Sequence, residues 1–91
     1  MSNFIIGERR YVYTAVTSST DEDFTISSAS YSIYDASDNS LVSSGTATVF
    51  NNNIYTLWTP ENYGIFVVEF LYEVGSEVFS SRQIIEVNNT I

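Results

Sequence analysis

Alternation with a period of two residues is the feature that most constrains how this chain folds. Residues 65–73 read IFVVEFLYE, so one face of an extended strand carries Phe66, Val68, Phe70 and Tyr72, all apolar or aromatic. The opposite face mixes two glutamates with aliphatic residues, which is typical of a sheet face that is only partly covered. No window of a dozen residues shows the 3.6-residue period of an amphipathic helix. The pattern predicts β-structure with the first face turned to the core.

Shorter segments of the same kind occupy most of the chain. They are residues 9–18, 28–35, 40–50, 53–58 and 77–87. Clusters of Asn, Asp, Ser, Gly and Pro separate them, and hairpin turns are expected near residues 35–40, 51–53 and 74–76. Six or seven short strands at such spacing indicate an all-β sandwich or barrel with mostly antiparallel pairing.

Two of these segments carry more specific predictions. Residues 40–50 are rich in Ser and Thr and contain Gly45, which favours an edge strand with a bulge or bend. Residues 77–87 place Phe79 and Ile85 in one phase of the alternation but Val78 and Ile84 in the other. Because apolar residues fall in both phases, we expect a bulge or a twisted strand there.

Trp58 and Pro60 are the only tryptophan and the only proline of the chain. Their proximity suggests either a ligand platform or a structural role. Trp58 continues the face of Ile54 and Thr56, which points it to the core. Pro60 has no N–H for a β-ladder and should end that strand. We therefore interpret Pro60 as the end of the strand and Trp58 as a side chain that fills the core.

The composition bounds both size and chemistry. Ninety-one residues suit one domain, residues 1–91. The absence of cysteine excludes thiol nucleophiles, zinc–thiolate sites and disulfides, and the absence of histidine removes the usual general base. The sequence therefore predicts a protein that is not an enzyme and holds no metal or other cofactor.

The charge balance restricts the partners. The net charge is −8, with three arginines and no lysine. Such a chain cannot form the basic face that nucleic acid or an anionic membrane requires. The first residues lack the pattern of a signal peptide, and no apolar run approaches a membrane span. We expect a complete small protein that is synthesised in the cytoplasm.

The C-terminal half, residues 51–87, resembles the Ig-like β-sandwich repeats of filamins and of many bacterial and phage proteins. Their pattern is an aromatic residue, one residue, proline, a short turn, glycine, then an aromatic residue that opens an alternating strand. It falls here on Trp58, Pro60, Gly64, Phe66, Val68 and Phe70, the expected fold-defining core. The resemblance implies an immunoglobulin-like β-sandwich of about seven mostly antiparallel strands. Two positions depart from it: Phe66 stands where a corner tyrosine is common, and Tyr63 replaces a frequent proline and could supply a hydroxyl to the corner.

The whole chain also resembles small Ig-like proteins of phage and prophage structural-gene clusters, through residues 7–16, 24–35 and 44–49. This resemblance implies a virion component of head, neck or tail that contacts protein subunits of an assembly, rather than a small molecule. A homo-oligomer fits the same expectation. The alternative is a carbohydrate-binding or adhesion module of a bacterial surface protein.

Several residues are candidates for sites. Tyrosine is enriched at recognition surfaces, and the expected interaction surface consists of Tyr11, Tyr13, Tyr34 and Tyr55. Alternatively, these rings only stabilise the sheets as cross-strand pairs. The acidic residues 21–23, with Asp35 and Asp38, suggest calcium but match no calcium-loop spacing, and a solvated loop is the preferred interpretation. Glu69 and Glu73 lie too far apart along a strand for acid–base catalysis. Two interpretations are open for the apolar termini, residues 2–6 and 87–91: they become ordered only against neighbouring subunits, or they fray.

Overall fold

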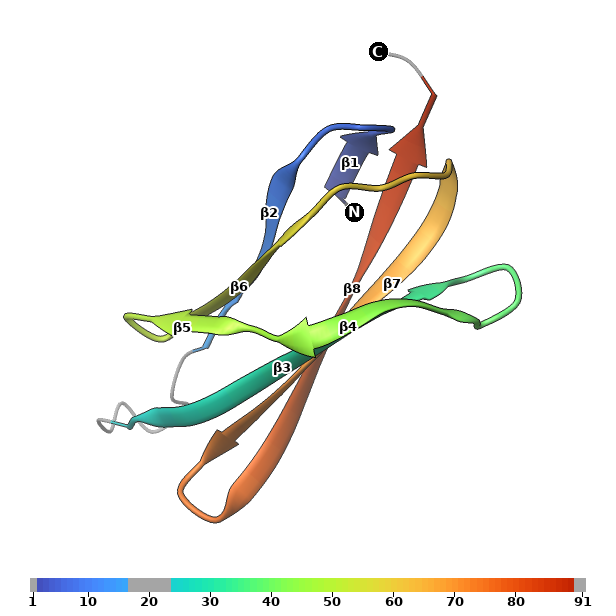
Figure 1. The fold of residues 1–91 in the computed structure, drawn as a ribbon. Coiled ribbons are helices and arrows are strands. Elements are labelled where there is room, and N and C mark those ends of the chain that lie inside the picture. Colours follow the sequence, from blue (N-terminus) through green and yellow to red (C-terminus); the bar gives the residue numbers. More distant parts are fainter. Residues whose placement is uncertain (1, 17–23, 90–91) are drawn as a thin grey trace.

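The computed structural model describes residues 2–16 and 24–89, and these residues form eight β-strands and no helix (Figure 1). Within these residues, therefore, no helix has the length and hydropathy of a membrane span. The strands are β1 Ser2–Ile5, β2 Arg10–Ala15, β3 Ile26–Asp35, β4 Leu41–Thr46, β5 Thr48–Phe50, β6 Asn53–Trp58, β7 Gly64–Val74 and β8 Glu77–Asn88. The predicted all-β class is confirmed.

The strands form two sheets that pack as a β-sandwich. The large sheet has the order β1-β8-β7-β3-β4, and the small sheet has the order β2-β6-β5. Pairing is antiparallel except between β1 and β8, which are parallel. Side chains tie the sheets together where β2 lies near β8. There the amide of Gln83 donates to the carbonyl of Tyr13 over 2.8 Å, and the hydroxyls of Thr14 and Ser81 lie 3.2 Å apart.

The core lies between the sheets and follows the alternation of the sequence. Side chains of β7 and β8 fill its centre, since Val68, Phe70 and Ile85 are fully buried. Ile33 of β3 and Ile54 of β6 meet them, also fully buried. The other buried apolar residues are Phe4, Val12, Ile26, Ala29, Ala47, Trp58, Phe66 and Val87. No polar or charged side chain of the described residues is buried in this core, as expected where no partner exists to offset desolvation.

Two tight turns show why the hairpins form where the sequence predicts them. Asn51 and Asn52 both have positive φ, 49° and 64°, between the paired residues Phe50 and Asn53. Two consecutive left-handed residues define a type I′ turn, and Asn adopts that conformation more readily than other side chains. Gly75, with φ of 63°, begins the turn of the β7–β8 hairpin. The predicted hairpins near 51–53 and 74–76 are confirmed, as is the β3–β4 turn at 36–40.

Residues 40–50, expected to form one strand, form two, and together with β1, which was not among the six expected segments, this raises the number of strands to eight. β4 is the edge of the large sheet, as predicted, and the chain then crosses to the small sheet at buried Ala47. The Ala47 N–H donates to the carbonyl of Ala29 over 3.0 Å and holds this crossing. The predicted bulge is present in β4 but lies at Val42 and not at Gly45, because Ile33 pairs with Ser43 and the next residue of β3, Tyr34, pairs with Leu41.

β8 has no bulge. Its pairing with β7 runs without a register shift from Gly64 opposite Val87 to Val74 opposite Glu77. The apolar residues of the second phase, Val78 and Ile84, are simply exposed on the outer face of the large sheet. The long hairpin twists strongly, which agrees with the other prediction for this segment (Figure 1).

The N-terminal segment is ordered by the chain itself and not by a neighbouring subunit. β1 pairs with β8, and Phe4 is buried. The Arg10 guanidinium donates to the carbonyl of Asn3 over 2.8 Å and lies 4.6 Å from the centroid of the Phe4 ring. This cation–π contact and hydrogen bond join β1 to the start of β2. Of the C-terminal segment, residues 90–91 lie outside the described residues.

Candidate functional site

The outer face of the small sheet brings three of the four predicted surface tyrosines together. Tyr11 and Tyr13 lie on β2, two residues apart, and Tyr55 of β6 pairs directly with Tyr13. They alternate with Val12 and Ile54, which are buried, so the three rings project away from the core. The alternation in residues 9–18 and 53–58 is what aligns them.

These rings are accessible and partly pack on one another. Tyr11 is 58% exposed and Tyr13 65% exposed. Tyr11 and Tyr55 meet edge to face, with ring centroids 5.4 Å apart and planes at 88°. Together with Asn53 the three tyrosines line an open hollow on the sheet. The Tyr11–Tyr55 contact is a stabilising aromatic pair, and Tyr13 is largely exposed, so the interaction surface stays a prediction.

Two further apolar residues on this face were not predicted from the sequence. Leu57 lies opposite Tyr11 and is 46% exposed, and Phe50 lies opposite Asn53 and is 64% exposed. The signal for Leu57 was present, because it shares the phase of Tyr55 in residues 53–58. Phe50 required the knowledge that β5 belongs to the small sheet. We call Tyr11, Tyr13, Phe50, Tyr55 and Leu57 the aromatic face.

No charged side chain projects from the outer side of the small sheet in the strands that the structure describes. The positions in the outward phase are Tyr11, Tyr13, Ala15, Thr48, Phe50, Asn53, Tyr55 and Leu57. Carboxylates lie instead on β7 and β8, such as Glu69 and Glu86, and in the turns, such as Asp38 and Glu61. In a chain of net charge −8, this segregation leaves one face on which another protein can pack without desolvating carboxylates.

Tyr34 does not belong to this face. It lies on β3 of the large sheet, between Val67 of β7 and Leu41 of β4. Ile84 pairs with Val67 on the other side, so a row of apolar side chains crosses the outer face of the large sheet. The next row carries the ion pair between Arg82 Nε and Glu69 Oε2, at 2.7 Å. The sequence could not separate Tyr34 from the other tyrosines, because sheet membership is not encoded in the alternation.

The fold-defining residues lie at the other end of β6. Trp58 is 8% exposed and packs between Phe4, whose ring is tilted to the indole, and Phe66, which meets it edge to face, with ring centroids 5.9 and 5.3 Å from its own. β6 ends at Trp58, and Pro60 is fully buried, its carbonyl accepting the N–H of Gly7 over 3.0 Å. Gly64, with φ of 138°, begins β7, and Phe66, Val68 and Phe70 follow as buried residues.

Tyr63 plays no part in holding this corner. It is 66% exposed, and its hydroxyl forms no hydrogen bond with the described residues. The corner is held instead by the Gly7–Pro60 backbone hydrogen bond and by Trp58–Phe66 packing. The hypothesis that Tyr63 supplies a hydroxyl is therefore wrong.

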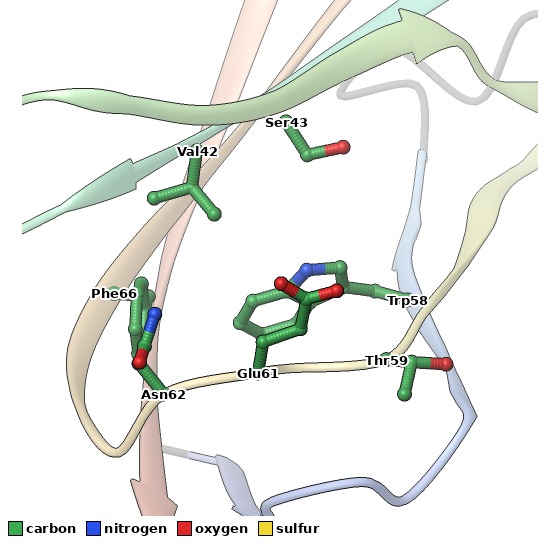
Figure 2. A pocket seen from close by; sticks show the side chains of 7 residues that line it. All are labelled: Val42, Ser43, Trp58, Thr59, Glu61, Asn62 and Phe66. Carbon is green, nitrogen blue, oxygen red and sulfur yellow. The ribbon is translucent and has the colours of Figure 1, made fainter.

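A pocket opens beside Trp58, between β4 and the β6–β7 connection (Figure 2). The rings of Trp58 and Phe66 form its apolar part, and the carboxylate of Glu61 lines the same pocket (Figure 2). The remaining lining residues are Val42, Ser43, Thr59 and Asn62. Trp58 thus fills the core with most of its surface and presents the rest to this pocket.

The carboxylates of the described residues do not gather into a metal site. Within residues 2–16 and 24–89 no three of the Asp and Glu side chains gather as metal ligands, and residues 21–23 lie outside this description. Asp35 and Asp38 cap the β3–β4 turn, accepting the N–H groups of Ser37 and Ser40 over 2.9 and 3.0 Å. Hydrogen bonds from Ser40, its side chain first, lower the pKa of Asp38. The hydrogen bond to Glu69, aided by its charge, raises the pKa of Arg82.

No family model matches this chain, and neither a curated protein nor a solved structure is similar to it. Its function is therefore argued from its own surfaces.

Proposed function

We propose that this chain is a non-enzymatic Ig-like module that acts as a structural component of a protein assembly, such as the head, neck or tail of a phage or prophage virion. The observation that carries the proposal is the aromatic face, on which Tyr11, Tyr13, Phe50, Tyr55 and Leu57 gather and whose outward positions within the described strands carry no charge. The partner is another protein subunit.

The chemistry of the aromatic face matches the centre of a protein interface. Such centres are enriched in tyrosine and phenylalanine and depleted of charged residues. Tyrosine contributes a large contact area for the loss of few rotamers, and its hydroxyl can still bond to a partner. Contiguous exposed apolar surface is uncommon on proteins that act alone, because water disfavours it. Burying the aromatic face against a subunit removes that cost.

The order of the strands supports the Ig-like part of the proposal. In immunoglobulin variable-type domains one sheet contains strands B, E and D, and the other contains G, F, C and C′. Taking β2 and β3 as B and C, the orders β2-β6-β5 and β8-β7-β3-β4 correspond to these strands. Phe66, near the start of β7, then occupies the corner position where such domains often have tyrosine. The virion setting rests on the resemblance of residues 7–16, 24–35 and 44–49 to phage proteins.

Carbohydrate binding is the second candidate, favoured by the open hollow that Tyr11, Tyr13, Asn53 and Tyr55 line. An aromatic ring beside an amide is a combination that suits a sugar. However, the edge-to-face geometry of Tyr11 and Tyr55 leaves no flat platform of parallel rings. We therefore place protein binding first.

The test compares two tyrosines of nearly equal exposure. Tyr13, 65% exposed, lies on the aromatic face, and Tyr63, 66% exposed, lies in the β6–β7 connection. Particles are purified from the organism that encodes the chain, carrying the wild-type, Tyr13→Ser or Tyr63→Ser protein, and the protein is quantified by mass spectrometry. We expect the wild-type and Tyr63→Ser proteins to be present in the particles in similar amounts. The amount of Tyr13→Ser protein should be at least about tenfold lower, which is the effect of removing roughly one interface anchor.

The outcomes separate the candidates. Absence of the wild-type protein from particles, or equal incorporation of both variants, contradicts the proposal. Binding to a glycan array that Tyr13→Ser abolishes and Tyr63→Ser preserves would support the carbohydrate-binding alternative instead.

A further inference from the structure

β4 leaves one edge of the large sheet open. Strand Leu41–Thr46 pairs with β3 on one side only, and it contains neither a charged residue nor a proline. Leu41 is 58% exposed and Val42 46% exposed. Proteins usually protect such an edge with charges, proline, bulges or a covering segment, because unpaired N–H and C=O groups attract another strand. The β4 strand has neither charge nor proline, and its single bulge at Val42 leaves Ser43–Thr46 in regular register with β3.

The other sheet edges are less available. β1 spans four residues and β5 three, which limits the number of hydrogen bonds that either can form. β2 is as long as β4, but the side chain of Gln83 from β8 already donates to its Tyr13 carbonyl. Among the described strands, β4 is therefore the edge best suited to accept an additional strand.

The pocket beside Trp58 lies directly against this edge. Val42 and Ser43 of β4 form one wall, and the β6–β7 connection forms the other (Figure 2). The indole N–H of Trp58 has no hydrogen-bond partner among the described residues, although the side chain is only 8% exposed. Figure 2 shows the indole nitrogen on the side of the ring that faces β4 across the pocket.

The lining selects a basic side chain. The long alkyl stem of lysine or arginine can lie against the rings of Trp58 and Phe66, and its charge is attracted by those rings and by the Glu61 carboxylate. Asp35 at the end of β3, Asp38 in the β3–β4 turn and the net charge of −8 add to the attraction. Side chains of an added strand alternate between the sheet faces, so every second residue points toward this side of the sheet.

We infer that β4 is a docking edge for an extended segment of a partner protein, which adds a strand to the large sheet and places a lysine or arginine side chain in the pocket beside Trp58. Backbone hydrogen bonds to β4 supply affinity, and the pocket supplies the preference for a basic residue. The inference does not depend on the aromatic face, which lies on the other sheet. A second copy pairing through its own β4 fits poorly, because that strand carries no basic residue.

The test uses a short capped peptide in which threonine and valine alternate and arginine replaces the central valine. A matched peptide carries glutamate in place of the arginine. Each is titrated into the isotope-labelled full chain by two-dimensional NMR. We expect the arginine peptide to shift the amide signals of β4 and the indole N–H signal of Trp58. The glutamate peptide should bind at least about fivefold more weakly, since it exchanges an attraction for a repulsion.

Two variants separate pocket recognition from general charge. Glu61→Gln removes the pocket carboxylate, and Glu77→Gln removes an exposed carboxylate at the start of β8 with the same change of net charge. We expect Glu61→Gln to weaken binding of the arginine peptide by up to about fivefold, which is the upper range for an exposed ion pair. Glu77→Gln should leave this binding unchanged. Both positions lie at the surface, so both variants should fold.

Several results overturn the inference. They are an absence of shifts in β4 at millimolar peptide, shifts confined to another surface, equal binding of both peptides, and equal effects of the two variants. A dimeric mass for the chain alone, with β4 amides protected from hydrogen exchange, would show that a second copy covers the edge and would also overturn it.

Discussion

Trp58 shows at the scale of one residue how a rare side chain acquires its role. Its position in the alternation of β6 turns it inward, and Phe4 and Phe66 pack against its ring from β1 and β7. It thereby joins the N-terminal strand to the body of the sandwich. Only the edge that faces the pocket between β4 and the β6–β7 connection remains available to a ligand.

Replacing this ring should cost much of the stability of the fold. Trp58→Ala leaves a cavity beside Phe4 and Phe66, and we expect a loss of about 3–5 kcal/mol in the free energy of unfolding. A chain of this length has roughly 5–13 kcal/mol in total. Urea denaturation measures the loss. Tyr63→Ala, at an exposed aromatic residue, is the control and should change stability by less than about 0.5 kcal/mol. A loss below 1 kcal/mol for Trp58→Ala contradicts the core role.

At the scale of the elements, the turns decide which strands pair and in which register. The β5–β6 turn requires two left-handed residues, and the chain supplies Asn51 and Asn52. The β3–β4 turn is held by hydrogen bonds that the backbone N–H groups of Ser37 and Ser40 donate to the side chains of Asp35 and Asp38. These residues lie within a few positions of their partners, which is why the hairpins could be predicted from the sequence.

The second position of the β5–β6 turn is not optimal. Glycine adopts the left-handed conformation without the steric cost that any Cβ incurs, and Asn-Gly is the preferred type I′ pair. We therefore expect Asn52→Gly to raise the free energy of unfolding by about 0.5 kcal/mol. Chemical denaturation of wild type and variant checks this value. Asn52→Val should lower the free energy of unfolding, and a stabilising effect of valine would contradict the turn assignment.

The structure of the β3–β4 turn should change when Asp38 becomes protonated. Its pKa is lowered by Ser40, so the charged form is favoured in the folded state. The turn contact is therefore present above the ordinary pKa of 3.8 and is lost as pH falls through the lower folded value. An NMR titration of the Ser40 amide proton should show a midpoint below 3.8. Asp38→Asn should abolish this step, and a midpoint above 3.8 would contradict the assignment.

At the scale of the whole molecule, charge and apolar surface are separated. The outer side of the small sheet is uncharged in its described strands, whereas the large sheet and the turns carry carboxylates. The large sheet also has an apolar row of Ile84, Val67, Tyr34 and Leu41. The molecule therefore has two apolar surfaces of different composition, one on the outer side of each sheet.

The excess of negative charge should make the fold sensitive to salt. Like charges repel in the compact state, and salt screens this repulsion. The ion pairs Glu8–Arg10 and Glu69–Arg82 have exposed guanidinium groups, so the loss from screening them is small. We expect the Tm at pH 7 to rise by about 5 °C between low and high sodium chloride, equivalent to roughly 1 kcal/mol.

The control for this prediction is pH. Near the isoelectric point of about 4.1 the net charge is close to zero, and the effect of salt on the Tm should nearly vanish. Differential scanning calorimetry at both pH values measures the two effects. A Tm that falls with salt at pH 7 would show that specific ion pairs outweigh the net repulsion.

The sequence by itself determined which features of this protein are local. The period of two assigned the β class and the buried face of β7, and neighbouring Asn, Asp and Gly residues located the hairpins, because both effects act over a few adjacent residues. It also grouped Tyr11 with Tyr13, since residues two apart on a strand share a face.

Only the tertiary structure decided which faces belong together. The crossing at Ala47 assigns β4 to one sheet and β5 to the other, which sends Phe50 to the aromatic face and leaves β4 as an open edge. Tyr34 is separated from the other tyrosines for the same reason. Sheet membership depends on contacts between residues far apart in the chain, and their energy is set by the packing of the whole core. The alternation of one strand shows that it has two faces, but not which neighbour covers either of them.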